Sequence, residues 1–250
     1  MTTSIDKHHV KGKLGSDFWR IRVPPDLVPK MALEIDWNRM GRRVMIDAKE
    51  GIIAWMSPSS LHADLSSASD KIVQLAGATL KTIVKDKRDN RWGSPGDPKN
   101  VGLEADAAFY VGDNAVGWYT ARRKGQEEKE AYEARTPPDL VVEVEVTHFD
   151  EDKPQRYAEL GVREMWRVDG KKGSGQLQIE ILDLQASSDG PKPVEESRIL
   201  PGLPLFVLPE AYELADMGQL QRLSVLLRDN LAQANTPEPD SSPLSFGSGI

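Results

Sequence analysis

PPDLVVEVEVTHFDEDKPQRY, residues 137–157, places two glutamates inside a run of valines. Side chains on a β-strand alternate between its two faces, so Val142 and Val144 share one face while Glu143 and Glu145 share the other. An edge strand with its valines inward and its glutamates in water would give the same pattern without any function. The stretch therefore predicts a strand whose two acids point the same way, and it leaves their role open.

A second stretch, LEADAAFYVG at residues 103–112, predicts another strand and repeats the two-residue spacing with Glu104 and Asp106. If the two strands are neighbours, four acids crowd together, and each raises the pKa of the others unless a cation neutralises them. Mg²⁺ prefers oxygen ligands and often binds through one or two carboxylates plus waters and substrate phosphates. The two strands are therefore a candidate metal site suited to phosphodiester hydrolysis, where a bound ion acidifies the attacking water.

Lys153 follows the first stretch closely, and its position is constrained by the next residue, Pro154. A proline disfavours helical geometry at the residue before it, so Lys153 is expected at or just before the start of a helix. Its side chain can then turn back toward the end of the strand and supply a fixed positive charge. The alternative is a solvated lysine that pairs with the neighbouring acids Asp150, Glu151 or Asp152.

The composition limits the class of protein. A chain of 250 residues that is 39% hydrophobic, with six tryptophans, is long enough to bury a sizeable core. There are no cysteines, so disulfides and thiolate metal sites are excluded, and any metal must bind oxygen or imidazole. The net charge of -7 argues against loose, charge-driven binding to nucleic acid. No apolar run approaches the length of a membrane span, so the cytoplasm is the expected compartment.

The remaining pattern predicts an α/β fold, a mixed central β-sheet flanked by helices, with an N-terminal β-hairpin region around residues 43–56. One domain is expected over residues 31–234, preceded by an extended arm at 1–30 and followed by a disordered Pro/Ser/Gly-rich tail at 235–250. Within the domain, a long helix is expected after Ser57, a charged surface insertion at 117–136 and a last helix at 210–230.

These segments together resemble the Uma-two family, whose members are assigned as restriction endonucleases. The stretch at residues 137–157, continued by AELGVREMWRVDG, resembles the family's signature of an acidic valine strand, a lysine four residues before a tyrosine, and a following strand. Three further landmarks occur in the family's order: MSPSSLH at 56–62, GLEADAAFYVG at 102–112 and SRILPGLPLFV at 197–207. The resemblance covers about residues 35–214.

The resemblance implies a restriction-endonuclease-like fold of the PD-(D/E)XK nuclease superfamily, a Mg²⁺ or Mn²⁺ cofactor, a DNA substrate and a homodimer. Position by position, Asp106 matches the first acid, Glu143 the second, and Lys153 the lysine, which is displaced here from the strand to the following helix. Glu145 stands where the superfamily's strand motif has its lysine, which makes it a candidate extra ligand.

Some positions depart from the family pattern or have a less specific role. Ala105 replaces the proline that commonly precedes the first acid, and no acid near Asp47 aligns with the family's N-terminal glutamate, so a ligand from that region stays unassigned. His62 matches the family's histidine. It either caps the helix or bonds a backbone carbonyl, or it lines the cleft together with Glu104. Tyr157 is interpreted as core packing.

Three classes of function remain open. The first is a Mg²⁺-dependent DNA endonuclease with Asp106, Glu143, Glu145 and Lys153 at its centre. The second is a catalytically silent nucleic-acid-binding or regulatory module on the same fold, which the acidic net charge favours. The third is a dimerisation scaffold that uses the charged insertion. Basic residues in and beside the loop at 85–100 would follow a phosphate backbone or form ordinary solvated surface: Lys81, Lys85, Lys87, Arg88 and Arg91.

Overall fold

A computed structural model describes most of the chain. The described residues are 6–11, 17–28, 30–31, 43–47, 50–56, 60–87, 91–92, 101–145, 151–170, 177–186 and 190–234. Two sequence predictions fall outside these ranges, namely the tail at 235–250 and the role of Arg88 in the basic loop.

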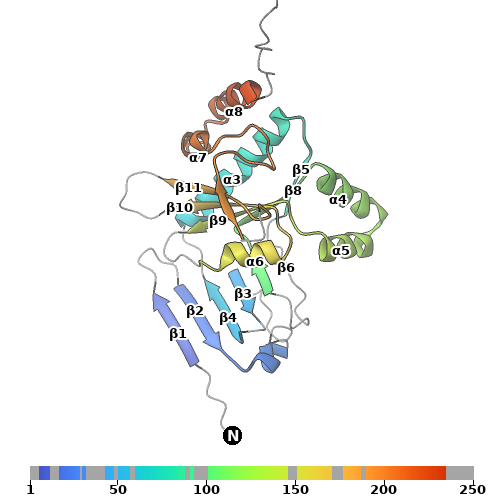
Figure 1. Ribbon diagram of the computed structural model, residues 1–250, viewed down its shortest axis with the longest axis vertical. Coiled ribbons are helices and arrows are strands. Elements are labelled where there is room, and N and C mark those ends of the chain that lie inside the picture. The colour runs from blue at the N-terminus through green and yellow to red at the C-terminus, as the bar shows by residue number, and fades with distance from the viewer. Residues whose placement is uncertain are drawn as a thin grey trace, which may run out of the picture.

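The N-terminal sheet has the strand order β1-β2-β4-β3-β7-β6 (Figure 1). Its strands are β1 (Asp6–Lys11), β2 (Asp17–Arg22), β3 (Arg43–Asp47), β4 (Ile52–Met56), β6 (Arg91–Trp92) and β7 (Val101–Glu104). The predicted hairpin of β3 and β4 is confirmed. Gly51, at φ +68°, lies in the turn of this hairpin, where an added Cβ would lie 2.2 Å from the carbonyl oxygen of Val23.

The segment expected to be an extended arm instead contributes β1 and β2 to this sheet. β2 pairs antiparallel with β4, and β1 pairs antiparallel with β2. The sequence of β1 and β2 has little apolar periodicity of its own. The two strands form because β2 pairs with β4, which lies about 30 residues further along the chain.

The central sheet has the order β12-β11-β10-β9-β8-β5. Its strands are β5 (Val84–Asp86), β8 (Ala107–Val111), β9 (Leu140–Glu145), β10 (Glu164–Asp169), β11 (Gln178–Asp183) and β12 (Lys192–Val194). β9 and β10 run parallel, while β8 and β9 run antiparallel, so the predicted mixed sheet is confirmed. All residues of β9 are buried, which matches its valine-rich sequence.

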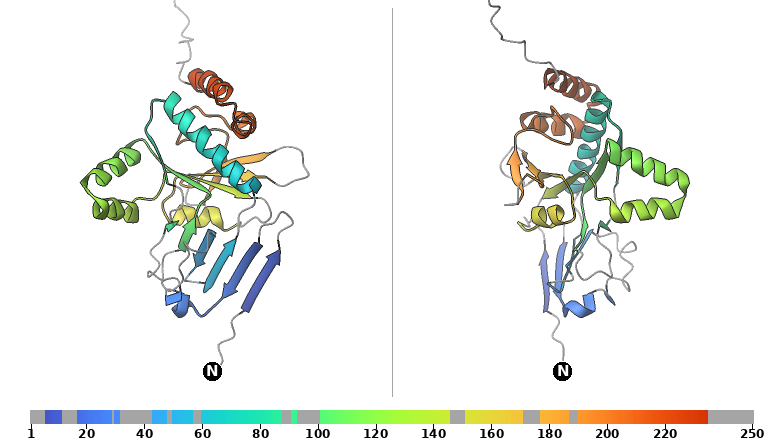
Figure 2. Two further views of the ribbon diagram at one scale, coloured as in Figure 1. Left: turned by 180° about the vertical axis from the view of Figure 1, so that it is seen from behind. Right: turned by 45° about the vertical axis from the view of Figure 1, so that its right-hand side comes forward.

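Helices cover both faces of the central sheet (Figures 1 and 2). One face packs against α3 (Ser60–Thr79), α7 (Leu208–Asp216) and α8 (Leu220–Ala234) around the main apolar core. The other face carries α6 (Lys153–Glu159), which lies between the two sheets. The predicted last helix is thus two helices, α7 and α8, separated near Gly218 at φ +70°.

Two predicted segments differ in detail. The single strand expected at 103–112 is broken, because β7 ends at Glu104 in the N-terminal sheet and β8 begins at Ala107 in the central sheet. The chain therefore crosses between the sheets at Ala105 and Asp106. The charged insertion is a helical hairpin of α4 (Asp113–Lys124) and α5 (Gln126–Arg135), which projects from the side of the domain (Figure 2).

Candidate active site

Asp106 and Glu143 are brought together by the pairing of β8 with β9. The register places Ala107 opposite Val142, so the residue before Ala107 lies beside the residue after Val142. The carboxylate of Asp106 extends this pairing, because its Oδ2 accepts a hydrogen bond from the backbone N–H of Val144 at 2.5 Å. The register thus places Asp106 beside Glu143, whereas the binding of one ion by both acids stays a prediction.

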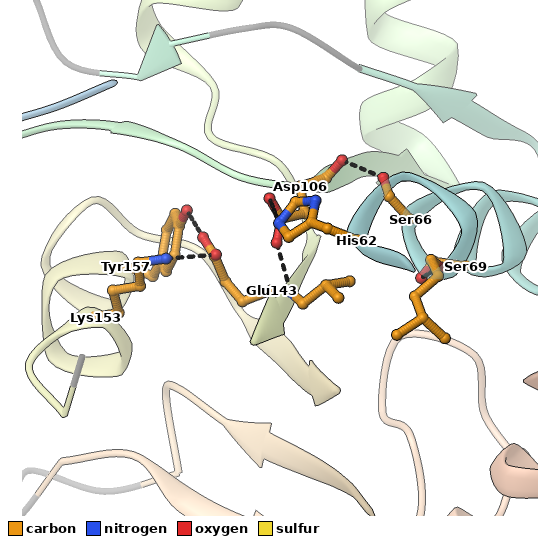
Figure 3. A network of polar contacts seen from close by, with 9 residues as sticks. His62, Ser66, Ser69, Asp106, Glu143, Lys153 and Tyr157 are labelled. Carbon is orange, nitrogen blue, oxygen red and sulfur yellow. Dashed lines mark hydrogen bonds and ion pairs between the residues drawn. The ribbon is translucent and has the colours of Figure 1, made fainter. Parts of the chain in front are cut away.

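Helix α3 fixes Asp106 with two residues one helical turn apart. His62 Nε2 lies 2.9 Å from Oδ1 of Asp106, and Ser66 Oγ donates a 2.7 Å hydrogen bond to the Asp106 backbone carbonyl (Figure 3). Residues four apart on a helix lie on the same face, so both reach the same target. The contact of His62 with Asp106 is an ion pair when the imidazole is protonated.

Helix α6 holds Glu143 in the same way from the other side of the sheet. Lys153 Nζ lies 2.6 Å from Oε2 of Glu143, and the Tyr157 hydroxyl donates a 2.5 Å hydrogen bond to Oε1 (Figure 3). Lys153 is the first residue of α6 and Pro154 the second, as the sequence predicted. The ammonium pairs with the strand acid, which favours this arrangement over the alternative of a solvated lysine.

Burial and crowding set the charges at this site. Glu143 is 1% exposed, and burial raises the pKa of its carboxyl group, as does the negative charge of Asp106, while the ammonium of Lys153 opposes both. Burial disfavours the charged form of Lys153, but the charges of Glu143, Asp106 and Glu145 outweigh it and raise the pKa of the lysine. Lys153 is therefore held in its charged form among the acids.

The other two predicted acids are placed differently. Glu145 is buried at the end of β9, two residues beyond Glu143, and its charge acts on Lys153. Glu104 ends β7 in the N-terminal sheet, opposite Arg91 of β6, and its side chain lies outside the described part of the structure. The expectation that Glu104 and Asp106 share one strand is therefore wrong, because the strand breaks between them.

The chain matches the model of one protein family over most of its length. Residues 31–209 match the model of Uma2, whose description is "Putative restriction endonuclease". The chain belongs to the Uma2 family.

The Uma2 match agrees with the resemblance drawn from the sequence motifs, and it covers more than half of the chain. Uma2 belongs to the PD-(D/E)XK-like superfamily, which is consistent with the mixed sheet described above. No curated protein matched the chain. Among the described residues, no helix is both long and apolar enough to cross a bilayer.

The acids of this Uma2 chain fit a divalent ion that takes only a few protein ligands. Within the described residues, no group of three or more His, Cys, Asp or Glu is arranged to hold a metal ion. Mg²⁺ needs only one or two protein carboxylates, because waters and substrate phosphates complete its coordination. A carboxylate oxygen has two lone pairs, so an oxygen that accepts one hydrogen bond can still bind an ion. The site fits such an ion through these two residues, with Glu145 next to them.

Other acids of the Uma2 motifs have structural partners. Asp139 accepts hydrogen bonds from the backbone N–H of Val111 at 2.8 Å and from the side-chain amide of Asn114 at 2.9 Å, which ties β9 to the start of α4. Glu164 accepts from the Ser197 hydroxyl at 2.7 Å and from the Trp166 indole at 2.8 Å. The family motifs therefore mix site residues with residues that hold loops in place.

The sequence reasoning missed two members of the site. Tyr157, interpreted as core packing, is buried but also binds Glu143, and its spacing of four residues from Lys153 was the available signal. Ser66 contacts Asp106, and a serine within a helix carries no comparable signal. The Asp47 side chain lies outside the described part, so an N-terminal ligand stays unassigned.

The basic loop contributes less free charge than its sequence indicates. Lys87 is buried and forms a 2.5 Å ion pair with Glu133 of α5. Lys85 lies 4.7 Å from the centre of the Trp118 ring of α4. Both lysines therefore attach the helical hairpin to β5, and phosphate binding by this loop stays a prediction for residues outside the described part, such as Arg88.

Proposed function

We propose that this Uma2 chain is a metal-dependent endonuclease that hydrolyses phosphodiester bonds of DNA. The observation that carries the proposal is the contact of the partly buried Lys153 ammonium group with Glu143, which the pairing of β8 with β9 places beside Asp106. A positive charge placed among carboxylates that can also bind an ion is the combination that phosphoryl transfer requires.

The site residues would have two roles, binding of the metal ion and stabilisation of the charge that develops during the reaction. Asp106 and Glu143, with Glu145 as an additional ligand, would hold Mg²⁺ or Mn²⁺. When bound, such an ion would polarise a phosphoryl oxygen and acidify a water. Lys153, which the surrounding acids keep charged, would orient the water and stabilise the negative charge that develops on the phosphoryl group.

The helices would keep this arrangement rigid before substrate binds. His62 and Ser66 fix Asp106 from α3, while Tyr157 fixes Glu143 from α6. Groups that orient metal-binding carboxylates commonly change metal affinity when they are removed. His62 is therefore proposed as a positioning residue rather than one that touches the substrate.

A second candidate function is a catalytically silent nucleic-acid-binding or regulatory module. Two observations favour it: the described residues contain no three-ligand metal cluster, and each oxygen of Asp106 and Glu143 contacts a protein donor. This function predicts weak metal binding and no cleavage of single-stranded, duplex or branched DNA.

A cleavage assay separates the two functions. Supercoiled plasmid and linear duplex DNA are incubated with the purified chain in Mg²⁺ or Mn²⁺, with chelator as the blank. The endonuclease predicts nicked or linear products from the wild type and none from Asp106→Asn, Glu143→Gln or Lys153→Ala. Lys124→Ala removes an exposed lysine from the helical hairpin and should cut as the wild type does. Identical cutting by wild type and Lys153→Ala would refute the assignment of Lys153.

A further inference from the structure

Helix α4 has one buried face and one exposed face. Its buried residues Ala115, Trp118 and Ala121 face the domain. Gly117 packs on α5 so closely that an added Cβ would lie 2.5 Å from the Tyr132 hydroxyl oxygen. At 100° per residue, the opposite side of α4 presents a set of exposed residues that we name the α4 stripe: Asp113, Val116, Tyr119, Thr120 and Arg123.

The centre of the α4 stripe is apolar. Val116 is 46% exposed and Tyr119 is 36% exposed. The rings of Tyr119 and Trp118 pack edge to face, with their centroids 5.1 Å apart. Ile83, which is 49% exposed, lies beside the start of α4, because its carbonyl accepts a hydrogen bond from the Gly112 N–H. Exposed apolar side chains gathered on one helix face mark an interaction surface.

The ends of the α4 stripe carry opposite charges in an order that complements itself. Asp113 begins the stripe and Arg123 ends it, with the three-four-three spacing of a helix-packing seam between them. When two such helices pack antiparallel about a two-fold axis near residue 118, Asp113 faces Arg123 of the second copy and Val116 faces its Thr120. Tyr119 then lies close to the two-fold axis, next to Tyr119 of the second copy.

We propose that the α4 stripe is a homodimer interface, formed by antiparallel packing of α4 against α4 of a second copy of this chain. A two-fold interface uses the same surface patch on both subunits, which requires the self-complementary order of charged, apolar and charged residues found here. The interface depends neither on metal nor on DNA, so it is separate from the proposed nuclease activity.

The same order of charges also suits the dipole of a single helix, which favours acids at its start and bases at its end. A double charge swap distinguishes the two explanations. Asp113→Lys combined with Arg123→Glu restores both pairs across the dimer but opposes the helix dipole at both ends. Recovery of the dimer by the double variant therefore cannot come from a more stable helix.

The test is sedimentation velocity of the full chain over a concentration series, without metal or DNA. The wild type should dimerise, Arg123→Glu should raise the dimer Kd at least about tenfold through repulsion across the axis, and the double swap should return it close to the wild-type value. Glu127→Lys, a charge reversal of equal size and opposite sign outside the stripe, should leave the Kd unchanged. A monomeric wild type, or a double swap that stays folded but no less monomeric than Arg123→Glu, would overturn the proposal.

A second variant keeps the test valid if the double swap unfolds α4, which circular dichroism would detect. Thr120→Lys replaces a residue of low helix propensity by one of higher propensity, so it should not weaken the helix. It also places a charge in the apolar centre, opposite Val116 of the second copy, and should abolish the dimer. A Thr120→Lys variant that dimerises like the wild type would exclude the α4 stripe as the interface.

Discussion

The ammonium of Lys153 lies 2.6 Å from Oε2 of Glu143, and the two residues come from different elements, α6 and β9. Glu143 is buried, so water does not solvate its carboxylate. The ammonium of Lys153 stabilises the negative charge instead. A lysine at the start of the helix thus reaches an acid of the preceding strand. This relationship leads to predictions on activity and on stability.

Lys153→Met removes the charge and keeps most of the length of the side chain. Cleavage should fall by about 10²-fold or more, because the variant lacks the positive charge near the reacting phosphoryl group. The free energy of unfolding should fall by roughly 3 kcal/mol, because Glu143 is left buried without its ion-pair partner. Urea unfolding and plasmid cleavage measure the two effects.

The control for this variant is Glu143→Gln combined with Lys153→Met. It removes both charges, so most of the lost stability should return, whereas cleavage should stay absent because a ligand is also missing. An ion pair that matters only for folding would instead give a Lys153→Met protein that cuts DNA normally once it is folded.

The stability of Lys153→Met should depend on pH in a defined direction. Burial raises the pKa of Glu143, and Lys153 counteracts this, so the pKa should rise further in the variant. A carboxyl group whose pKa is higher in the folded than in the unfolded chain favours folding below the unfolded value, 4.5 here, and this contribution is lost as pH rises through the folded pKa. The free energy of unfolding of Lys153→Met should therefore decrease as pH rises above 4.5.

The comparison that isolates Glu143 is again the double variant with Glu143→Gln, which has no titrating group at this position. Urea unfolding of both proteins between about pH 4.5 and 8 should give curves that diverge as pH rises. Parallel curves would show that Glu143 does not titrate as proposed.

Tyr157→Phe tests the hydroxyl group alone, because the ring and its packing remain. Loss of a hydrogen bond to a buried charged acceptor should lower the free energy of unfolding by about 1.5–3 kcal/mol. Since the hydroxyl also lowers the pKa of Glu143, the acidic limb of the pH–rate profile should move to higher pH. A loss of stability with an unchanged pH–rate profile would confine Tyr157 to packing.

His62→Ala and Ser66→Ala test how α3 holds Asp106. His62 contacts the carboxylate itself, so its removal should weaken Mn²⁺ binding by about 10- to 100-fold. Ser66 contacts only the backbone carbonyl of Asp106, so Ser66→Ala should change Mn²⁺ affinity much less. Isothermal titration of both variants with Mn²⁺ gives the comparison, and equal affinities would argue against His62 as a positioning residue.

The sequence predicted the elements that depend on local pattern. The valine repeat of β9 indicated a strand with both glutamates on one side, and Pro154 indicated the start of α6 at Lys153. These two features are determined within short stretches of the chain. The approach of Asp106 to Glu143 was expected only on the condition that the two acidic strands are neighbours, and the pairing of β8 with β9 fulfils that condition.

What the sequence did not predict depends on contacts between distant segments. Every second residue from Leu103 to Val111 is apolar, as in one continuous strand, although the chain changes sheets within this stretch. β2 is stabilised by pairing with β4, and α4 by burial of Trp118 beside β5, neither of which leaves a local periodic signal. Hydrogen bonds such as that of Tyr157 with Glu143 likewise require the fold to be known.

The central claim is that Asp106 and Glu143 bind one divalent ion within reach of Lys153. Crystals soaked in Mn²⁺ and measured for anomalous scattering test it most directly. The account predicts one peak about 2.0–2.2 Å from a carboxylate oxygen of each acid, and no peak in Asp106→Asn crystals treated identically. Absence of a peak at saturating Mn²⁺, or a peak bound to other residues while these carboxylates keep only their protein partners, would contradict it.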